Sequence, residues 1–577
     1  MSKTRMVTAN KGWVREAISK IAEVNPVTML PPTELDNLDV PFYEMSAIDE
    51  YSGKLRDAAI VPLRDCRTGK TKFQNGDVLF AKITPCVQNR KSALVNGLPG
   101  NFACGSSEFY VLRPGKRVLP EYLFYFIRQD PVIHAAVESF TGTSGRQRVP
   151  RTFWNCLEIP LSPLPVQERI VEILQKADEI RKKRKEALEL ADKILPALFL
   201  EMFGDPATNP KGYERVTIGE VTTLVTSGYT PRGGARNYVT EGPLLLRSQN
   251  IQMLTLDLED CAHLPEHIFR DMQRVHVQQG DVLLNITGKG TAGRVAWVES
   301  SNLRAAVNQH VCIIRPKPDR IRSEYLAFTL STPPYQHIIE NAPGSAQSGF
   351  NHARVRALEI LVPPLPVQDA FVAQVQALAV TRTKCLFASD SVERGFEAMV
   401  TRAFTGELTA EWEAANAEWI AERQAFYERL PGLVILALLA EKAKRAGRAA
   451  ATVLITALMK YVFLFQMEGN GGRRRLYHFV PYHYGPFAKE LYTDLGKLQE
   501  EGLVQVESNP EEDKTKITLT DQVRTEALLA ELPEDLKEDA AAVISTYGDL
   551  DHNSLLEVVY EKYPAYAKKS RLRQRRA

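Results

Sequence analysis

Short runs of apolar and β-branched residues recur along the first 400 residues of the chain and predict β-strands. The runs from Asp77 to Ile83 and from Phe109 to Leu112 are bounded by Gly, Pro or Asn, and the runs from Asp281 to Ile286 and from Val311 to Ile314 repeat the pattern. Runs of this length and composition are typical of strands. Aromatic residues and leucines follow at helical spacing in the segments 120–139 and 323–340. The pattern therefore predicts two similar globules of mixed α and β structure.

A three-then-four rhythm of apolar residues follows each globule and predicts a long helix. The first helix is expected from Gln167 to Phe203, about 55 Å at 1.5 Å per residue. Pro196 lies inside it and is expected to kink or break its last turns. The apolar positions are 170, 173, 177, 180, 187, 191, 194 and 198 in the first copy, and Val372, Val375, Leu378, Cys385, Val392, Phe396, Met399 and Ala403 in the second.

The apolar stripes of these two helices can be buried in two ways. They can pack against each other as an antiparallel pair, which would act as a rigid spacer between the globules, or each can pack on its own globule. The charged run from Arg181 to Lys185 favours the spacer, because it is interpreted as a solvent-exposed face.

The two halves of this region are copies of one unit. Residues Leu157 to Gln167 align with Leu358 to Gln368 without a gap. Further matches occur in the same order: Gly76-Asp77-Val78-Leu79 with Gly280-Asp281-Val282-Leu283, Arg113-Pro114 with Arg315-Pro316, and Glu121-Tyr122-Leu123 with Glu324-Tyr325-Leu326. A spacing of roughly 200 residues is far longer than the periods of solenoid repeats, so the repeated unit is a whole domain.

The last third of the chain has a different pattern. Trp412, Trp419 and Phe426 recur every seven residues and predict a connecting helix over residues 412–430. Beyond Pro431, two apolar helical runs, a leucine-rich amphipathic stretch and a Gly-Leu-Val turn at residues 502–504 predict helices followed by a β-wing. This part is therefore expected to be a mainly helical, winged-helix-like domain.

Composition places the chain among ordinary globular proteins. It has 577 residues, 44% of them hydrophobic and 25% charged, with a net charge of +2, and its length suggests roughly three to five domains. Seven scattered cysteines without a CxxC pair indicate neither a zinc site nor a disulfide framework, so reduced thiols are expected. The start lacks a signal-peptide pattern, and Lys460 interrupts the apolar stretch 450–467, which favours a buried helix and a cytoplasmic protein.

Motifs typical of catalysis are missing from the sequence. Thr332-Pro333-Pro334-Tyr335 resembles the tetrapeptide of amino-methyltransferases but lacks the acidic or amide first residue and a preceding glycine loop. No phosphate-binding Gly-x-x-x-x-Gly-Lys-Ser/Thr run occurs. Histidines are dispersed without metal spacing, and His310 and His352 are interpreted as structural or DNA-facing. We therefore expect no catalytic site, no metal site and no bound cofactor in this chain.

The ordered set of motifs in residues 1 to about 412 resembles the specificity subunits of Type I restriction-modification systems. The resemblance is carried by Leu164-Pro165-Val166-Gln167-Glu168, Leu365-Pro366-Val367-Gln368-Asp369, the two Gly-Asp-Val-Leu strands and Ala403-Phe404-Thr405-Gly406-Glu407-Leu408. It implies two target recognition domains, each reading half of a split site in double-stranded DNA. It also implies partner subunits: two methylation subunits that bind S-adenosylmethionine, and restriction subunits that use ATP and Mg. A departure is visible at Ala377 to Ala379, where the second helix is less charged than the first.

The expected fold is α/β mixed (α+β), with two tandem recognition globules joined by two long antiparallel helices. The expected domains are 1–163 (first recognition domain), 164–206 (first spacer helix), 207–364 (second recognition domain), 365–411 (second spacer helix), 412–430 (connecting helix), 431–567 (C-terminal domain) and 568–577 (basic tail).

Basic and amide side chains in Gly- or Ser-punctuated loops are the candidate DNA contacts. Arg and Lys suit guanine edges or phosphates, and Asn and Gln suit adenine. For any one of these residues a solvated surface role is as good an interpretation as contact with DNA. The candidates are Arg64, Arg67, Lys70, Lys72, Lys82, Arg90, Lys91, Arg146, Gln147 and Arg148 in the first globule, and Arg232, Arg236, Arg247, Gln249, Asn250, Lys289, Arg294, Gln347 and Asn351 in the second.

Residues of the C-terminal domain resemble the Panacea-type antitoxin domain family, through Tyr484-Gly485-Pro486-Phe487, the leucine-rich stretch that follows and the Gly-Leu-Val turn. The resemblance implies a partner-binding or sensing module, and a plain winged-helix packing domain is the alternative.

For the whole chain, the alternative to DNA recognition is a toxin-neutralising or phage-sensing interaction protein dominated by this domain. The basic tail could contact phosphates as a flexible arm.

Overall fold

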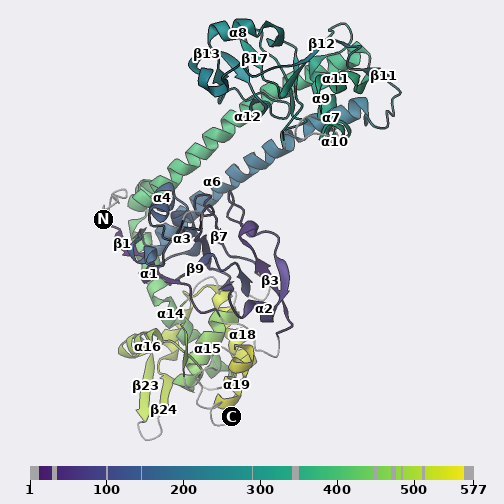
Figure 1. Cartoon of the computed structure of the whole chain (residues 1–577). Coiled ribbons are helices and arrows are strands. Elements are labelled where there is room, and N and C mark those ends of the chain that lie inside the picture. Colours follow the sequence, from purple (N-terminus) through teal and green to yellow (C-terminus); the bar gives the residue numbers. More distant parts are fainter. Residues whose placement is uncertain are drawn as a thin grey trace. The chain divides into compact units, whose positions relative to one another are not determined.

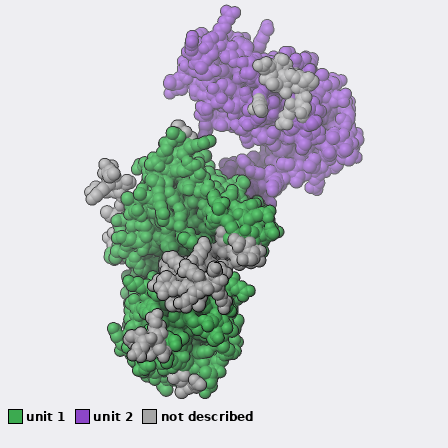
Figure 2. All heavy atoms as spheres, turned by 60° about the horizontal axis from the view of Figure 1, so that its bottom comes forward, with its two compact units in different colours: residues 1–182, 393–577 green, residues 183–392 purple. Residues whose placement is uncertain are grey.

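The computed structural model describes residues 12–28, 36–98, 102–143, 146–288, 290–340, 350–447, 451–468, 476–477, 479–482, 485–509 and 514–563 (Figure 1). The chain forms two compact units. One contains Met1–Lys182 and Glu393–Ala577, and the other contains Lys183–Val392 (Figure 2).

The first globule lies in the first unit and is built mainly on two four-stranded sheets. Its elements are β1 (Val14–Ala17), α1 (Ile18–Ile21), β2 (Ala22–Val24), β3 (Asp39–Tyr43), β4 (Ala59–Pro62), α2 (Leu63–Cys66), β5 (Thr71–Gln74), β6 (Val78–Ala81), β7 (Ser92–Leu94), β8 (Phe102–Gly105), β9 (Phe109–Pro114), α3 (Pro120–Ile127), α4 (Asp130–Glu138), α5 (Phe153–Cys156) and β10 (Glu158–Leu161). One sheet has the order β2-β9-β6-β7, the other β4-β3-β8-β5, and β1 pairs with β10.

The second globule lies in the second unit and repeats part of this topology. Its elements are β11 (Glu214–Thr217), β12 (Thr222–Ser227), β13 (Val239–Leu246), β14 (Ala262–His263), α8 (Glu266–Asp271), β15 (Val282–Asn285), β16 (Val295–Trp297), β17 (Ala305–Val307), β18 (Val311–Pro316), α9 (Ser323–Ser331), α10 (Pro333–Glu340), α11 (His352–Ala357) and β19 (Glu359–Val362). The sheet β12-β18-β15-β16 matches β2-β9-β6-β7, and the pair β11–β19 matches β1–β10. The predicted strands and paired helices of both globules are confirmed.

The Gly-Asp-Val-Leu motifs are apolar because their strands are covered on both faces. Successive strand residues point to opposite faces, and Val78 and Phe80 of β6 enter one core while Leu79 enters another. In β15, Leu284 and Leu283 divide between two cores in the same way. A strand buried on both faces has a continuous apolar run instead of an alternating one.

The aspartate of each motif holds a buried ion pair. Asp77 and Asp281 are both fully buried. Arg113 donates Nε and Nη2 to the two oxygens of Asp77 at 2.7 and 2.6 Å, and Arg315 donates to Asp281 at 2.7 and 2.9 Å. Each aspartate also accepts the backbone N–H three residues earlier, at 2.9 and 2.7 Å. The matching Arg-Pro motifs therefore supply the partners that a buried carboxylate needs.

The glutamine of each Leu-Pro-Val-Gln motif fastens a long helix to its globule. Gln167 accepts the backbone N–H of Leu119 at 2.9 Å and donates to the carbonyls of Arg117 and Ser162 at 2.9 and 2.8 Å. Gln368 makes the three equivalent bonds at 2.8, 3.2 and 2.7 Å. Both side chains are fully buried, so each amide satisfies backbone groups that water does not reach.

Replacing Gln167 by leucine is expected to lower the free energy of unfolding by about 1–3 kcal/mol, because buried backbone groups lose their partners. Urea unfolding of the full chain measures this loss. Gln374→Leu is the matched control, since Gln374 is exposed on the second long helix. Equal effects of the two substitutions would contradict the anchoring role.

The long helices are α6 (Leu164–Ala191), α7 (Ile194–Phe203) and α12 (Leu365–Thr405). The first predicted helix breaks after Ala191, which confirms the interruption expected from Pro196. Pro196 falls in the first turn of α7, where the backbone N–H groups have no partner within the helix and a missing N–H costs nothing.

The ends of these helices are buried in the globules. Ile170 and Leu174 of α6 and Phe404 of α12 belong to the core of the first globule. Phe203 of α7 and Phe371 of α12 belong to the core of the second. Helix α12 therefore begins in the core of the second globule and ends in that of the first, and packing on a globule, the second of the two predicted alternatives, accounts for these apolar residues.

Between their ends, both helices expose apolar side chains, and Ile180 is the only one of the five below that belongs to a predicted stripe. The stripe positions Leu378, Cys385 and Val392 of α12 are half-buried, so burial of one stripe against the other stays a prediction. Exposed fractions are 58% for Ile180 and 64% for Leu190 on α6, and 58% for Val380, 44% for Leu386 and 71% for Phe387 on α12. The periodic pattern identified one apolar side of each helix, but it did not specify which surface covers that side.

The C-terminal domain has its own core in the first unit. Its elements and the segment that leads to it are α13 (Ala410–Ala415), α14 (Ala417–Arg445), β20 (Thr452–Leu454), α15 (Ile455–Glu468), β21 (Val480–Tyr482), β22 (Gly485–Phe487), α16 (Glu490–Glu500), β23 (Val504–Asn509), β24 (Lys514–Leu519), α17 (Gln522–Leu529), α18 (Glu534–Tyr547) and α19 (His552–Lys562). Strands β23 and β24 form an antiparallel hairpin after α16, where the wing was predicted (Figure 1).

The sequence suggested that the connecting helix ends at residue 430, but the helix extends beyond it. Helix α14 continues through Pro431 to Arg445. The buried side chains of Leu430, Leu433 and Val434 flank the proline and pack in the C-terminal core. Their burial offsets the backbone hydrogen bond that proline cannot make.

One cysteine pair also departs from expectation. Cys66 and Cys104 are buried and form a disulfide, with 6.0 Å between their Cα atoms. Strand β8 and helix α2 bring them together across 38 residues of sequence, a proximity that no local motif could indicate. None of the helices in the described part of the chain combines the length and apolarity needed to cross a lipid bilayer.

Candidate nucleic-acid interface

Several candidate DNA contacts of the first globule are engaged in ion pairs within the unit. The Glu108 carboxylate raises the pKa of Arg148, and Arg148 lowers the pKa of Glu108. The pairs are Arg67 with Asp36, Arg90 with Asp130 and with Glu397 (3.6 Å), Lys91 with Glu50 (3.5 Å), and Arg148 with Glu108 (2.7 Å). DNA would have to compete with these carboxylates for the cations.

The other candidates of the first globule differ in how far they are engaged. Arg64 donates to Asn37 at 2.5 Å, and Lys72 donates to the carbonyl of Arg67 at 3.0 Å. Burial lowers the pKa of Lys72. Lys70 lies 4.8 Å above the Phe42 ring and Lys82 5.6 Å from the Tyr110 ring. Within the described residues, the side chain of exposed Arg146 has no hydrogen-bond or ion-pair partner, and its neighbour Gln147 is half-buried.

Two amide candidates of the second globule have structural roles. Asn250 is 1% exposed, accepts the backbone N–H of Arg247 at 3.1 Å and donates to two loop carbonyls, so its selection as a DNA contact is wrong. Asn351 caps α11 by accepting the N–H of Arg354 at 3.0 Å. Both residues suit turns and helix starts as well as adenine, which is why sequence alone misassigned Asn250.

The remaining second-globule candidates divide into engaged and open side chains. Arg247 and Gln249 bond to Asp260 at 3.1 Å, and Arg294 donates to Gln252 at 3.0 Å. Arg232 and Arg236 are exposed, and in the described part of the chain neither side chain has a hydrogen-bond or ion-pair partner. Lys289 and Gln347 lie outside the described residues.

The proline-rich tetrapeptide is part of the fold. It starts α10, and its Tyr335 is 4% exposed and donates its hydroxyl to the carbonyl of Glu359 at 3.0 Å. Burial raises the pKa of Tyr335 to about 12, so the phenol stays protonated. His310 bonds to Thr287. These contacts give both residues structural roles.

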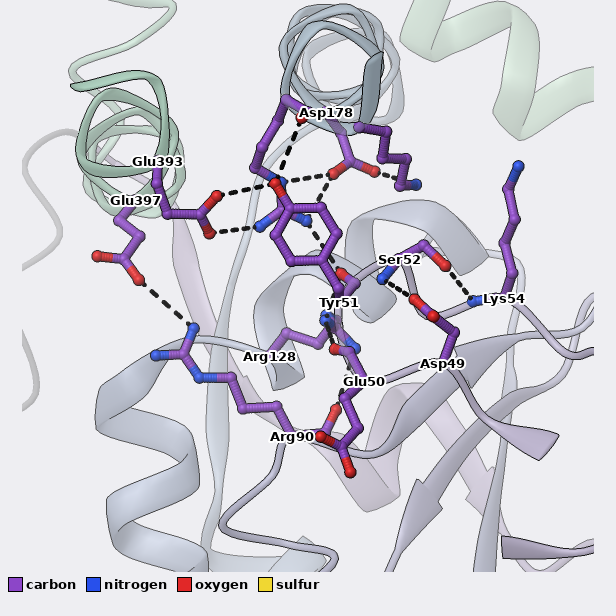
Figure 3. Close-up of polar contacts among 12 residues, drawn as sticks. Asp49, Glu50, Tyr51, Ser52, Lys54, Arg90, Arg128, Asp178, Glu393 and Glu397 are labelled. Atoms are coloured by element: carbon purple, nitrogen blue, oxygen red, sulfur yellow. Dashed lines mark hydrogen bonds and ion pairs between the residues drawn. The ribbon is translucent and has the colours of Figure 1, made fainter. Parts of the chain in front are cut away.

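Sequence reasoning missed a buried network around Arg181, which was interpreted as an exposed charge but is only 9% exposed. Its guanidinium donates to Asp178 at 2.7 Å, to Glu393 at 2.8 Å and to the carbonyl of Tyr51 at 3.0 Å. The Tyr51 and Phe396 rings lie 4.2 and 4.4 Å from it. Figure 3 shows Asp178, Glu393 and Tyr51 converging from the two helices and the globule.

Electrostatics favour the charged form of Arg181. Burial alone would lower its pKa, but the carboxylates of Asp178 and Glu393 outweigh that effect and raise it. Nearby, burial lowers the pKa of Arg128 to about 10. Arg128 donates to the carbonyls of Glu50 and Tyr51 at 2.7 and 3.0 Å, which holds the loop that carries Tyr51 (Figure 3).

Among the described residues, the second repeat keeps only the arginine–carboxylate pair of this network, because Asp192 corresponds to Glu393. Aligning Gln167 with Gln368 places Arg382 at the position of Arg181, and Ala379 at that of Asp178. Arg382 is 45% exposed and pairs with Asp192 at 2.6 Å. The weaker charge of the second helix, visible in its sequence, was therefore the available signal that the two repeats hold their helices differently.

The comparisons with known proteins all lead to the same family. Residues 10–190 and 210–380, more than half the chain, match the family described as Type I restriction modification DNA specificity domain. The chain is 22% identical over 470 residues to the Type I restriction enzyme EcoAI specificity subunit of Escherichia coli, covering 65% of this chain and 78% of that protein. It is 32% identical over 167 residues to the EcoEI specificity subunit of E. coli, covering 29% and 28%. With the EcoKI specificity subunit of E. coli K12 it shares 21% over 476 residues, covering 76% and 97%.

Solved structures with related sequences include a chain of a type I R-M system, at 21% identity and a TM-score of 0.46, covering 70% of this chain and 100% of that one. The HsdS subunit from Thermoanaerobacter tengcongensis has 21% identity and a TM-score of 0.34, covering 71% and 100%. The two-part match to the family, and its agreement with the duplicated topology, lead to one conclusion. The chain belongs to the Type I restriction-modification DNA specificity family.

Proposed function

We propose that this chain is the DNA-recognition subunit of a Type I restriction-modification complex, in which each globule reads one half of a bipartite DNA site. The observation that carries the proposal is the duplication itself, since both globules share a sheet order, a buried Asp–Arg pair and a glutamine anchor. Two similar recognition domains on one chain suit a split site. Each domain can bind one half-site, and the two half-sites must lie at a set separation along the DNA helix. The chain supplies recognition and no catalytic step.

The proposal assigns the chemistry to partners. Methylation subunits, two by the duplication, would bind S-adenosylmethionine, and restriction subunits would use ATP and Mg. The exposed apolar side chains of the second unit, among them Leu190, Val380 and Phe387, support docking of partner subunits on the long helices. A partner subunit docked on these helices would remove these apolar side chains from water.

An exchange of recognition domains tests the division of labour. Residues 207–364 are replaced by the corresponding domain of a relative, and the full chain is expressed with its methylation subunits. Mapping of methylated bases in the host genome is expected to show a change in one half of the bipartite motif only. A motif that stays whole, or that changes in both halves, would overturn the proposal.

Arg232 and Arg236 are expected to bind DNA phosphates, because both guanidinium groups are exposed and open. In the double variant Arg232→Ala, Arg236→Ala, the slope of log Kobs against log salt should fall by about 0.9 for each phosphate that is no longer neutralised, or about 2 in all. Titration of duplex DNA with the full chain at several salt concentrations measures the slope. Arg270→Ala is the control, since Arg270 is 75% exposed on α8 of the same globule and already lies near Glu266. If the double variant and the wild type gave the same slope of log Kobs against log salt, a phosphate-binding role for the two arginines would be excluded.

A further inference from the structure

A cavity of about 920 Å³ lies in the first unit where the first globule, the start of α6 and the C-terminal domain meet. One wall comes from the loop between β9 and α3, a second from the start of α6, and a third from α14 and α16. The walls are joined by the backbone N–H of Leu164, which donates to Gln424 at 2.9 Å, and by the Tyr427 hydroxyl, which donates to Glu168 at 2.6 Å. Cavities of this size at domain junctions are typical ligand sites.

The charges that line this cavity are mainly negative. Five carboxylates face three cationic side chains: Glu16, Glu168, Glu413, Glu428 and Asp494 against Lys116, Arg117 and Lys497. Arg117 is already paired with Glu16 at 3.2 Å, and Lys497 lies 3.6 Å from Asp494. Among the described residues, Glu413 and Glu428 accept hydrogen bonds from Thr409 and Gln424 but form no ion pair.

Two buried oxygens in the lining also lack hydrogen bonds of good geometry. Ser162 and Asp494 are 4% and 8% exposed. Ser162 Oγ and Asp494 Oδ2 make no hydrogen bond of good geometry in the described part of the chain, although the Tyr122 and Tyr477 hydroxyls lie near them. Both oxygens therefore have acceptor positions open to a ligand that supplies donors. Apolar side chains, including Trp13, Leu119 and Ile420, line the remainder.

We propose that this cavity binds a basic peptide segment of a partner protein, in which lysine or arginine side chains alternate with apolar ones. The cations would face Glu413 and Glu428, backbone N–H groups would reach the two buried oxygens, and the apolar side chains would cover Trp13 and Ile420. Charge complementarity excludes an acidic segment, because like charges at an interface are strongly unfavourable. The site is independent of DNA recognition.

The test uses the full chain and a short fluorescein-labelled peptide in which arginine alternates with leucine. Fluorescence anisotropy is expected to show binding of this peptide and not of the glutamate–leucine counterpart. The double variant Glu413→Gln, Glu428→Gln should weaken binding by about tenfold, since each exposed charge contributes up to about 1 kcal/mol. Ala417→Trp, at an exposed lining position, should weaken binding further, because the indole would occupy the part of the cavity next to Glu413.

The matched control is Glu411→Gln, Glu422→Gln, which removes two exposed carboxylates of α13 and α14 outside the cavity lining. This control should bind the peptide like the wild type, and urea unfolding should show that all variants remain folded. Equal peptide affinity in all variants, or no affinity in the wild type, would overturn the proposal. Binding of agmatine with no binding of the peptide would also overturn it, in favour of a small guanidinium ligand.

Discussion

Replacing Arg181 by alanine is expected to lower the free energy of unfolding of the first unit by about 3–5 kcal/mol, the cost typical of breaking a buried ion network by removing one partner. The substitution would leave the buried Asp178 and half-buried Glu393 without their shared cation. It would also remove the group packed between the Tyr51 and Phe396 rings. Urea unfolding of the full chain, read by hydrogen exchange in α6 and α12, measures the loss.

The repeat supplies the matched control for Arg181. Arg382→Ala removes the equivalent arginine of the second repeat, whose ion pair with Asp192 is half-exposed on both sides. Exposed ion pairs contribute about 0–1 kcal/mol, so this variant should remain close to the wild type. If Arg181→Ala were no more harmful than Arg382→Ala, the network would have no special role in holding α6 and α12 to the first globule.

Replacing Lys460 by methionine is expected to stabilise the C-terminal domain at pH 7 by a few kcal/mol. Lys460 is fully buried in α15, and its ammonium group donates to the carbonyl of Thr456 at 2.8 Å. Burial lowers its pKa from the ordinary 10.5 to about 7. Methionine fills similar space without an amine that must be desolvated.

The same substitution should remove a pH dependence. Between pH 7 and 10.5 the unfolded chain keeps the Lys460 proton while the folded chain releases it. Stability therefore rises with pH across this window, by on the order of 1.4 kcal/mol per unit. Burial and nearby Lys460 lower the pKa of His552 from its ordinary 6.5. His552 therefore gains or loses its proton below this pH window and does not contribute to the rise.

Urea unfolding of the full chain at pH 7 and pH 9, read by hydrogen exchange in α15, checks both expectations for Lys460. Lys444→Met is the control, because Lys444 is 78% exposed on α14. A wild type whose α15 is no more stable at pH 9 than at pH 7 would show that Lys460 is charged in the folded chain.

Much of the architecture could be predicted because it depends on local signals. The duplicated motifs located both globules, and the runs around Val78 and Val282 identified their central strands, since a strand covered on both faces must be apolar throughout. The repeated glutamines Gln167 and Gln368 marked the helix starts, although the three hydrogen bonds that explain them became visible only in the fold.

The candidate interface was less predictable, because the role of a polar side chain depends on partners that are distant in sequence. Arg148 and Glu108 lie 40 residues apart, and Arg181 and Glu393 lie 212 apart. Asn250 was selected for its chemistry, but a local loop uses the same amide donors internally. Only exposure and the absence of a partner within the described residues, as at Arg232 and Arg236, distinguish a side chain open to DNA from one that stabilises the fold.

By itself, the sequence determined the family, the duplication and the positions of most strands and helices, because periodicity and motif order are properties of the chain alone. The tertiary structure decided which surfaces those elements cover. It buried Arg181 instead of exposing it, left Ile180 and Phe387 open on the long helices, and carried α14 through Pro431. Each of these outcomes depends on the free energy of contacts between distant segments, which no local pattern contains.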